Sequence, residues 1–429
     1  MVDFSLSEQE RAFQEAARAF AIGEIAPTAE AVRRREPGVS PWSLVRPLFR
    51  HGSELGFTRL LIPEAYGGLG GRCFDNVLVM EEFGAADLGI AASYFNVSTT
   101  APMLLVKGGD EAQKQKWLGA MTASDDFVLA SASSEPNVAG ADTFCPYPDP
   151  AIGLQSFARR DGDHYVLNAA KAGFSTNAGA ASVYFVMART DLGRPAREST
   201  SMFVVPADAP GVRVGSKTEF LGWRTAMHAE VVFDEVRIPA ENRIGAEGAN
   251  AGMFFFETLP FLSTGLAAAY VGLARAAFEY AFEYAQQRVS WGRPILEHQA
   301  VALKLADMVA DLEAARLMVW KAAWAADQGD PQAAGVLAPA AKTFAVDVAI
   351  RNAERAVRIL GGYGVSSEYR TAGMLADAWV GDSCDGTRDM LRLGIIDFLK
   401  MTRLGPPPGM GPPGMGPPGV APADLEAVD

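Results

Sequence analysis

Metal-binding residue types are scarce in this sequence of 429 residues. The cysteines Cys73, Cys145 and Cys384 are widely separated, and the four histidines form no group. A zinc site needs several such ligands at short, characteristic spacings, so the sequence predicts no metal site. Three scattered thiols also fit a reducing compartment, and we therefore expect a cytoplasmic protein.

Positive charge and uninterrupted apolar runs are also in short supply. Against 51 Asp and Glu stand only 38 Lys and Arg, giving a formal net charge of −13. Such a balance argues against unaided binding to nucleic acid or to an anionic membrane. No basic and apolar leader is visible at the start, which predicts no signal peptide. The longest apolar run, residues 253–274, contains Glu257 and Pro260, so we expect a buried helix there and no membrane span.

Apolar residues are plentiful, at 49% of the chain, enough for one large core or two to three smaller ones. The first segment is predicted to be helical: Ser7 and Glu10 form a capping box, and apolar residues then repeat at helical spacing until Pro27. Further helices are expected after Pro41 and over two later segments, 76–83 and 111–121. These helices form a predicted N-terminal domain over residues 1–125.

The hydrophobic period changes from helical to alternating over residues 126–242. Short stretches rich in Val, Phe and Tyr are separated there by Gly, Pro and Asp, which is typical of strands joined by turns. The predicted strands begin near residues 127, 164, 182, 201, 211 and 229. This segment is therefore expected to be a β-barrel-like domain inserted between helical ones.

Long helical patterns return after residue 243. They cover residues 252–288, 297–328, 331–360 and 389–404, with Gly and Pro breaks between them, and predict a C-terminal four-helix bundle over residues 243–404. Residues 405–429 are rich in Gly, Pro and Met and are expected to be a disordered tail. The fold class is thus mostly α with an inserted β domain.

Asp385 and Gly386 interrupt the helical pattern near the C-terminus. An Asp at that position has two possible roles. It can cap the free backbone N–H groups at the start of the following helix, or it can serve as a base that points into a pocket. The local sequence alone favours the cap.

Seven short motifs occur in a characteristic order along the chain. They are Leu61-Ile-Pro-Glu-Ala-Tyr-Gly-Gly, Glu135-Pro with Ala139-Gly-Ala-Asp142, Phe174-Ser-Thr-Asn177, Arg288-Val-Ser-Trp-Gly-Arg-Pro, Glu297-His-Gln299, Leu360-Gly-Gly-Tyr-Gly364 and Asp385-Gly-Thr387. Together with the order of domains, this set resembles the acyl-CoA dehydrogenase family. The resemblance runs from about Phe4 to Met401 and leaves only the tail outside it.

The resemblance implies an FAD cofactor between the β domain and the C-terminal bundle. Residues expected near the flavin and its phosphates are Ser131, Ser133, Ser134, Ala141, Phe174, Thr176, Thr387 and Asp389. Phe174 stands where a Trp is usual, although packing in the core is an equally ordinary role for an aromatic residue. A second set is expected to reach the cofactor of a neighbouring subunit in a homotetramer or homodimer: Arg288, Ser290, Trp291, Gln299, Gly361 and Gly362. Arg358 is also expected to bind the cofactor.

The same resemblance implies that one carboxylate removes a proton alpha to a thioester carbonyl while a hydride leaves the beta carbon for the flavin. The family base is commonly the Glu of a Glu-Gly-Thr motif, and here that position is Asp385, one methylene shorter. No rival base stands at the other family position, where residues 260–262 are Pro, Phe and Leu. The substrate pocket is expected to include Thr99, Ser263, Cys384 and Gly386.

Several departures from the family pattern lie where substrate specificity is set. Ser263 replaces a common Arg, Ala376-Asp-Ala378 replaces Arg-Asp-Ala, and the loop at residues 143–153 is longer and richer in proline. We therefore expect a short, branched, cyclic or otherwise unusual acyl group, carried by coenzyme A or an acyl-carrier protein. Electron-transferring flavoprotein is the electron acceptor that the resemblance suggests.

Three alternatives remain open from the sequence. A nitroalkane-oxidase-like enzyme uses an Asp base on a carbon acid, and a flavin monooxygenase can be built on the same scaffold. The third alternative is a non-catalytic member that has lost the base. Asp385 and the flavin motifs favour the dehydrogenase.

Overall fold

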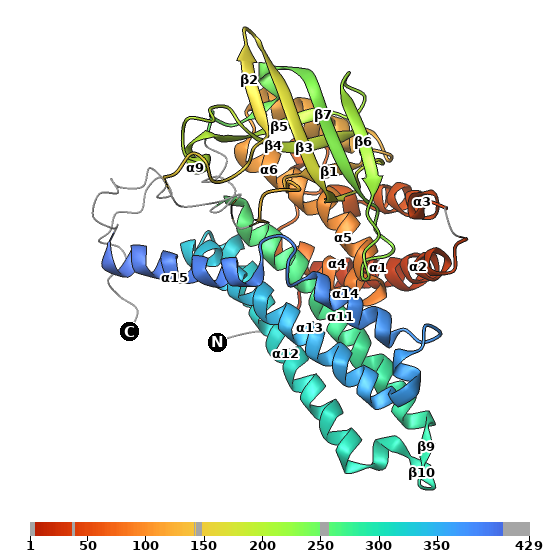
Figure 1. The fold of residues 1–429 in the computed structure, drawn as a ribbon. Helices are drawn as coiled ribbons and strands as arrows, with labels where there is room; N and C mark the ends of the chain where they lie inside the picture. The colour runs from red at the N-terminus through yellow and green to blue at the C-terminus, as the bar shows by residue number, and fades with distance from the viewer. Residues whose placement is uncertain (1–4, 37–38, 141, 143–147, 249–256, 406–429) are drawn as a thin grey trace.

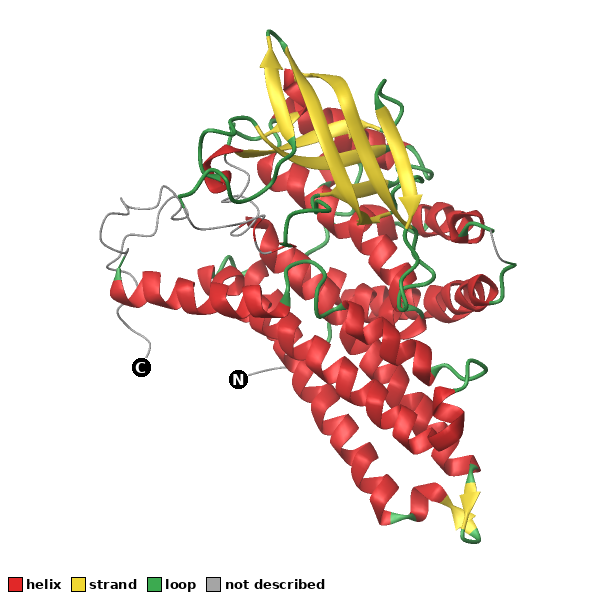
Figure 2. Cartoon of the chain, viewed as in Figure 1, coloured by secondary structure: helices red, strands yellow, loops and turns green. Residues whose placement is uncertain are grey.

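The computed structural model describes residues 5–36, 39–140, 142, 148–248 and 257–405. It has a β domain at one end and helices of both the N-terminal and the C-terminal segments beneath it (Figures 1 and 2). This arrangement confirms the expected fold class, a mostly helical protein with an inserted β domain. The boundaries drawn at residues 125, 242 and 404 stay predictions, and the tail after residue 405 lies outside the described residues.

The first helix begins as the sequence predicts but does not end at Pro27. The Ser7 hydroxyl accepts a hydrogen bond from the Glu10 N–H at 3.2 Å, and the Glu10 carboxylate accepts one from the Ser7 N–H at 2.7 Å. Helix α1 (Glu8–Phe20) then runs through a π-helical turn, Ala21–Ile25, into α2 (Ala26–Arg33). Pro27 therefore lies in the first turn of α2, where its missing N–H costs little.

The other helices of the N-terminal part surround one strongly buried helix, α4 (Cys73–Ala86). Two glycines let α4 approach the C-terminal helix α11 (Leu259–Gln287) closely: a Cβ on Gly84 would lie 2.1 Å from the Ala269 carbonyl oxygen, and one on Gly272 equally close to that of Glu81. The remaining members are α3 (Pro41–Glu54), α5 (Leu88–Phe95), the π-helical turn η4 (Asn96–Thr100), α6 (Ala101–Gly108), α7 (Glu111–Gln113) and α8 (Gly119–Ala123).

The β domain is built on an eight-stranded sheet with the order β6-β7-β3-β2-β4-β5-β8, and β1 pairs with β4. Its longest pairing joins β3 and β7 in antiparallel register, with a shift between Lys171 and Ser175. Sequence patterns missed β2 because this strand is short and three of its five residues are exposed. The strands are β1 (Leu129–Ala132), β2 (Phe157–Asp161), β3 (His164–Thr176), β4 (Val183–Arg189), β5 (Thr200–Pro206), β6 (Val212–Lys217), β7 (His228–Pro239) and β8 (Arg243–Ile244).

The C-terminal helices form a bundle that extends away from the sheet, as Figure 1 shows. At its far end the hairpin of β9 (Val289–Ser290) and β10 (Arg293–Pro294) follows α11. Residues 249–256, where the predicted helix at 252–288 begins, lie outside the described residues. The other bundle members are α12 (Gln299–Asp327), α13 (Ala338–Leu360) and α14 (Thr371–Val380). Helix α15 (Arg388–Leu404) runs crosswise to them (Figure 1).

Within the described ranges, two helical segments, Leu259–Gln287 and Ala333–Val365, are long and apolar enough to cross a membrane by length and composition alone. Their most apolar windows are 83% and 67% buried within the protein. Burial of this extent is typical of core helices, and it agrees with the buried helix expected from the apolar run.

Candidate active site

Asp385 lies in the loop that joins α14 to α15, and it does not cap α15. The cap is Thr387, whose hydroxyl accepts a hydrogen bond from the Met390 N–H at 3.3 Å. Asp385 instead has a left-handed backbone, with φ of 47°, followed by Gly386 at 85°. A left-handed Asp is uncommon and has to be held by its surroundings. The capping role suggested by the local sequence is therefore wrong.

Asp385 is an exposed residue whose carboxyl group is strongly influenced by the surrounding protein. The residue exposes surface to solvent, and among the described residues its carboxylate accepts no hydrogen bond. Burial by the surrounding protein raises the pKa of Asp385, and the positive charge of Lys342 opposes this rise. A reachable carboxylate with a raised pKa is suited to exchange protons with a ligand.

The Asp385 loop packs on α11 through a glycine. A Cβ on Gly381 would lie 2.5 Å from the Tyr270 ring, so only glycine fits there without movement. The Tyr270 hydroxyl lies 3.8 Å from the Cys384 sulfur. Cys384 and Gly386, both predicted to line the substrate pocket, are half-buried in this loop.

A second loop with predicted site residues follows β1 in the β domain. Ser131 is in β1, and Ser133 and Ser134 come directly after it; all three are half-buried. The Ser134 carbonyl accepts a hydrogen bond from the Ala172 N–H at 2.9 Å, which ties the loop to β3. Ala141, also predicted here, lies outside the described residues.

Buried Lys171 braces the same loop. Its ammonium group donates to the Ser133 carbonyl at 3.1 Å and to the Glu135 carboxylate at 3.0 Å. Burial acts to raise the pKa of Glu135, but the Lys171 charge and backbone N–H groups outweigh it and lower this pKa. Neither Lys171 nor Lys342 belongs to a motif that the sequence makes recognisable. A single Lys next to small apolar residues, as in Ala169-Ala-Lys171 and Ala340-Ala-Lys342, is the signal that could have found them.

Phe174 faces outward from the sheet and is not a core residue. The register shift between Lys171 and Ser175 makes β3 bulge, and Phe174 is 61% exposed there. Its ring stacks on Phe220, with centroids 5.8 Å apart, and half-buried Thr176 follows in the same strand. A bulge is a common means of turning a side chain toward a site. The core-packing role for Phe174 is therefore wrong.

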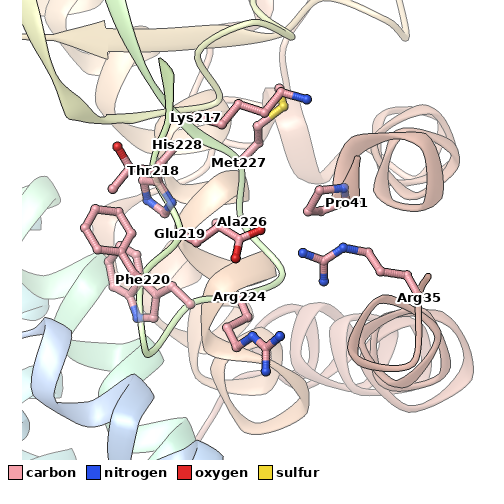
Figure 3. A pocket seen from close by; sticks show the side chains of 11 residues that line it. Arg35, Pro41, Lys217, Thr218, Glu219, Phe220, Arg224, Ala226, Met227 and His228 are labelled. Carbon is pink, nitrogen blue, oxygen red and sulfur yellow. The ribbon is translucent and has the colours of Figure 1, made fainter. Parts of the chain in front are cut away.

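A small pocket of about 50 Å³ lies behind Phe220. Figure 3 shows Phe220 beside His228, and Arg35 and Arg224 at the other side of the pocket. The Phe220 and His228 rings meet edge to face, with centroids 4.6 Å apart. Burial lowers the pKa of His228 to about 4, so this imidazole is neutral near pH 7.

The segment after Phe220 joins the β domain to the other two parts of the chain. The Trp223 N–H donates to the Asp377 carboxylate in α14 at 2.6 Å, and the Thr225 hydroxyl donates to Asp87, the cap of α5. Burial raises the pKa of Asp377 to about 7. Contacts therefore run continuously from Phe174 to α14, the helix that leads into the Asp385 loop.

The residues predicted to reach a neighbouring flavin gather at the far end of the bundle. Arg288, Ser290, Gly361 and Gly362 line one surface recess of about 690 Å³. Gly361 has φ of 63°, and a Cβ on either glycine would meet open space. Two other members of this set, Trp291 and Gln299, do not line the recess: Trp291 is 95% exposed, and Gln299 begins α12. Arg358, also predicted to bind the cofactor, lies outside the recess and pairs with Glu354 at 2.5 Å.

The last predicted residues differ in accessibility. Thr99 is fully buried in η4, and its hydroxyl donates to the Asn76 side chain at 3.2 Å. Ser263 is buried in α11, whereas Asp389 is exposed in the first turn of α15. No group of three or more His, Cys, Asp or Glu that could hold a metal occurs within the described ranges.

Comparison with known proteins gives one consistent result. Family models described as the N-terminal, middle and C-terminal domains of acyl-CoA dehydrogenase match residues 7–125, 130–236 and 255–399. The chain is 35% identical over 393 residues to the short-chain specific acyl-CoA dehydrogenase of Megasphaera elsdenii, covering 91% of this chain and 97% of that protein.

Solved structures with the same fold agree with this result. Butyryl-CoA dehydrogenase from Megasphaera elsdenii superposes with a TM-score of 0.84 at 34% identity, covering 93% of this chain and 100% of that one. The structure of PigA with FAD and proline superposes with a TM-score of 0.83 at 26% identity, again covering 93% and 100%.

Proposed function

Because the chain belongs to the acyl-CoA dehydrogenase family of FAD-dependent oxidoreductases, we propose that Asp385 is the base with which it dehydrogenates a short, branched or cyclic acyl thioester. The observation that carries this proposal is the state of the Asp385 carboxylate. Asp385 is an exposed residue, it caps no helix, its backbone is left-handed, and burial of its carboxyl group raises the pKa. Because Thr387 caps α15, the capping role does not account for this carboxylate.

The described residues offer the donors that FAD requires. Hydroxyl groups of Ser131, Ser133 and Thr176 are half-buried at the end of β1 and in β3, and the Phe174 ring is available beside them. Small hydroxyls and backbone N–H groups can bind a flavin and its phosphates without filling the space that the cofactor needs. When bound, FAD supplies the ring system that accepts the hydride from the beta carbon.

Asp385 would remove the alpha proton, and its raised pKa favours it as the receiving group. A carboxylate with the pKa of an ordinary Asp is a weak base near pH 7, and burial brings its proton affinity closer to the working pH. Because Asp is one methylene shorter than Glu, the alpha carbon has to come nearer to the loop. A small or compact acyl group meets this requirement best.

Two relatives are consistent with a compact acyl group. One is described as short-chain specific, and the other was solved with proline. The structure with proline shares this fold, with a TM-score of 0.83. Coenzyme A and the pantetheine arm of an acyl-carrier protein present the same thioester, so we include both as carriers, with electron-transferring flavoprotein as the proposed acceptor.

We further propose that two or four chains assemble, with each recess at the far end of a bundle completing a neighbour's flavin site. Arg288 and Gly361 line a recess beside the β9–β10 hairpin, which lies at the end of the bundle farthest from the β domain (Figure 1). Within one chain these residues are remote from the serines after β1. A second copy is the means by which both sets can contact one cofactor.

Replacing Asp385 by Asn tests the assigned base. The variant should keep FAD and reduce it more slowly by roughly 10²- to 10⁴-fold, because Asn cannot take up the proton. Wild-type protein is first mixed without oxygen with butyryl-CoA, a prolyl thioester and nitroethane, and bleaching of the flavin identifies the substrate used for the variants. Asp382→Asn, which changes an Asp of the same loop, is the matched control and should stay near the wild-type rate.

Two results would change the assignment. Flavin reduction at a near-normal rate in Asp385→Asn would remove Asp385 as the base. Bleaching by nitroethane alone would favour the nitroalkane-oxidase-like alternative, for which an Asp base is the specific observation. A protein that takes up no FAD would leave the non-catalytic alternative.

A further inference from the structure

One buried lysine, Lys342 of α13, binds the backbone of the Asp385 loop. Its ammonium group donates three hydrogen bonds, to the carbonyl oxygens of Gly381 at 3.2 Å, Cys384 at 2.6 Å and Gly386 at 2.9 Å. Lys342 is only 1% exposed. The three acceptors belong to a segment of six residues that encloses Asp385.

The setting of Lys342 is unusual for a buried cation. Among the described residues it forms no ion pair with Asp or Glu within 4 Å, and its three donors are used by main-chain carbonyls. Burying a lone ammonium is costly unless it is fully hydrogen-bonded or faces an opposite charge. Lys171, the other strongly buried lysine, has Glu135 as its partner. Lys342 has no such ion-pair partner, and the negative charge that attracts it is that of Asp385.

The three bonds account for the backbone of the loop. Asp385 and Gly386 are consecutive left-handed residues, with φ of 47° and 85°. This conformation directs the carbonyls of Cys384 and Gly386, on either side of Asp385, to the same ammonium group. Asp tolerates left-handed backbone better than most residues other than glycine, and the three bonds from Lys342 hold the loop in this conformation.

We propose that Lys342 is a positioning residue for Asp385: it fixes the loop through three carbonyls and, through its charge, keeps the carboxylate ionised and ready to accept a proton. This inference rests on the proposed role of Asp385 as the base. Lys342 does not itself reach the reacting atoms, because its three donors point to the loop backbone.

The other titratable groups near Asp385 cannot take over this charge. Tyr270 faces the loop from α11, and burial raises its pKa well above the ordinary range. Cys384 is next to Asp385 in the chain, and burial raises its pKa to about 11. Both are neutral near pH 7, so Lys342 is the cation that acts on Asp385 among the described residues.

The test replaces Lys342 by Met in the FAD-loaded protein and follows flavin reduction by butyryl-CoA, without oxygen, as a function of pH. The rate falls at low pH as Asp385 takes up a proton. Without the Lys342 charge the pKa of Asp385 should rise, and the midpoint of this fall should move up by about one pH unit. The rate at pH 7 should drop at least ~10-fold, with little change in the concentration of butyryl-CoA needed for half-maximal rate. Methylammonium added to a Lys342→Ala variant should restore part of the rate.

The control and a second readout separate positioning from general stability. Asp347→Asn removes ion pairs from Asp347 of α13 to Arg388 and to Arg392, the latter at 3.0 Å, and leaves the three carbonyl contacts intact. It can lower stability, but its pH midpoint should equal that of the wild type. Carbodiimide labelling of Asp385, measured by peptide mass spectrometry across the same pH range, reports the same pKa without turnover. Lys342→Gln replaces the Met variant if that protein does not fold.

An unchanged pH midpoint in both readouts, together with a near-normal rate, would overturn the role of Lys342. This outcome differs from failure of the proposed function, which would show as normal flavin reduction in Asp385→Asn. If butyryl-CoA does not bleach the flavin, the labelling midpoint alone decides the result for Lys342.

Discussion

Replacing Lys171 by Met should loosen the loop after β1 and weaken FAD binding. Lys171 is fully buried, and its ammonium donates to Glu135 at 3.0 Å, to the Ser133 carbonyl at 3.1 Å and to the Met187 carbonyl at 2.7 Å. The substitution removes all three bonds at once. It leaves one buried carboxylate without its cation and two carbonyls without this donor.

The loss of stability depends on which hydrogen bonds the partners of Lys171 retain in the variant. Breaking a buried ion pair typically costs about 3–5 kcal/mol. Glu135 retains hydrogen bonds from the N–H groups of Gln155 at 2.7 Å and Ser156 at 3.0 Å, which limits its share of the cost. The lost carbonyl bonds add to it, and we expect a total near ~4 kcal/mol. The displaced Ser133 and Ser134 should lower FAD affinity at least tenfold, equivalent to about 1.4 kcal/mol.

The assay compares urea unfolding midpoints at one fixed FAD concentration and measures FAD release by fluorescence. Glu135→Gln combined with Lys171→Met is the informative control, because it removes the unpaired charge together with the lysine. The double variant should recover more than half of the lost stability. A Lys171→Met protein within ~0.5 kcal/mol of the wild type, with unchanged FAD affinity, would refute this account of the loop.

Two further predictions concern pH and assembly. Burial lowers the pKa of His228 from 6.5 to about 4, so between these pH values the unfolded chain binds a proton that the folded chain does not. The contribution of His228 to the free energy of unfolding is therefore complete above about pH 6.5. It is lost as the pH falls toward 4, by up to ~3 kcal/mol. The pH dependence of urea unfolding should be weaker in His228→Asn, and equal slopes in both proteins would show that His228 does not titrate in this way. Light scattering should give the mass of two or four chains, and Arg288→Ala should lower FAD affinity more than tenfold without changing that mass. A monomer that binds FAD tightly would contradict the completion of the site by a second copy.

Local chemistry made part of this structure predictable from its sequence. The Ser7 and Glu10 capping box involves side chains three residues apart, and both of its bonds are present. The change from helical to alternating pattern near residue 126 likewise corresponds to the start of β1 at Leu129. Where local rules compete, however, prediction failed. Pro27 did not end its helix because a π-helical turn precedes it, and Thr387 was the better cap two residues after Asp385.

The candidate site was predictable as a set of motifs but not as an arrangement. Composition and spacing did not show that Lys171 lies under Ser133, or that Lys342 lies under Asp385. Lys171 and Ser133 are 38 positions apart in the chain, and Lys342 and Cys384 are 42 apart, so only the fold brings them together. The outward position of Phe174 was hidden for the same reason, since it depends on a register shift between two strands.

The contacts of Lys342 bear on how this scaffold can change its chemistry. Every hydrogen bond from its ammonium goes to a main-chain oxygen, and none depends on the side chain of residue 384 or 385. A carboxylate can therefore be lengthened to Glu or shortened to Asp, and the neighbouring thiol replaced, while the support beneath the loop stays the same. Reach and reactivity at position 385 can evolve separately from the structure that holds it, and Asp385→Glu is a direct way to redesign substrate choice in this protein.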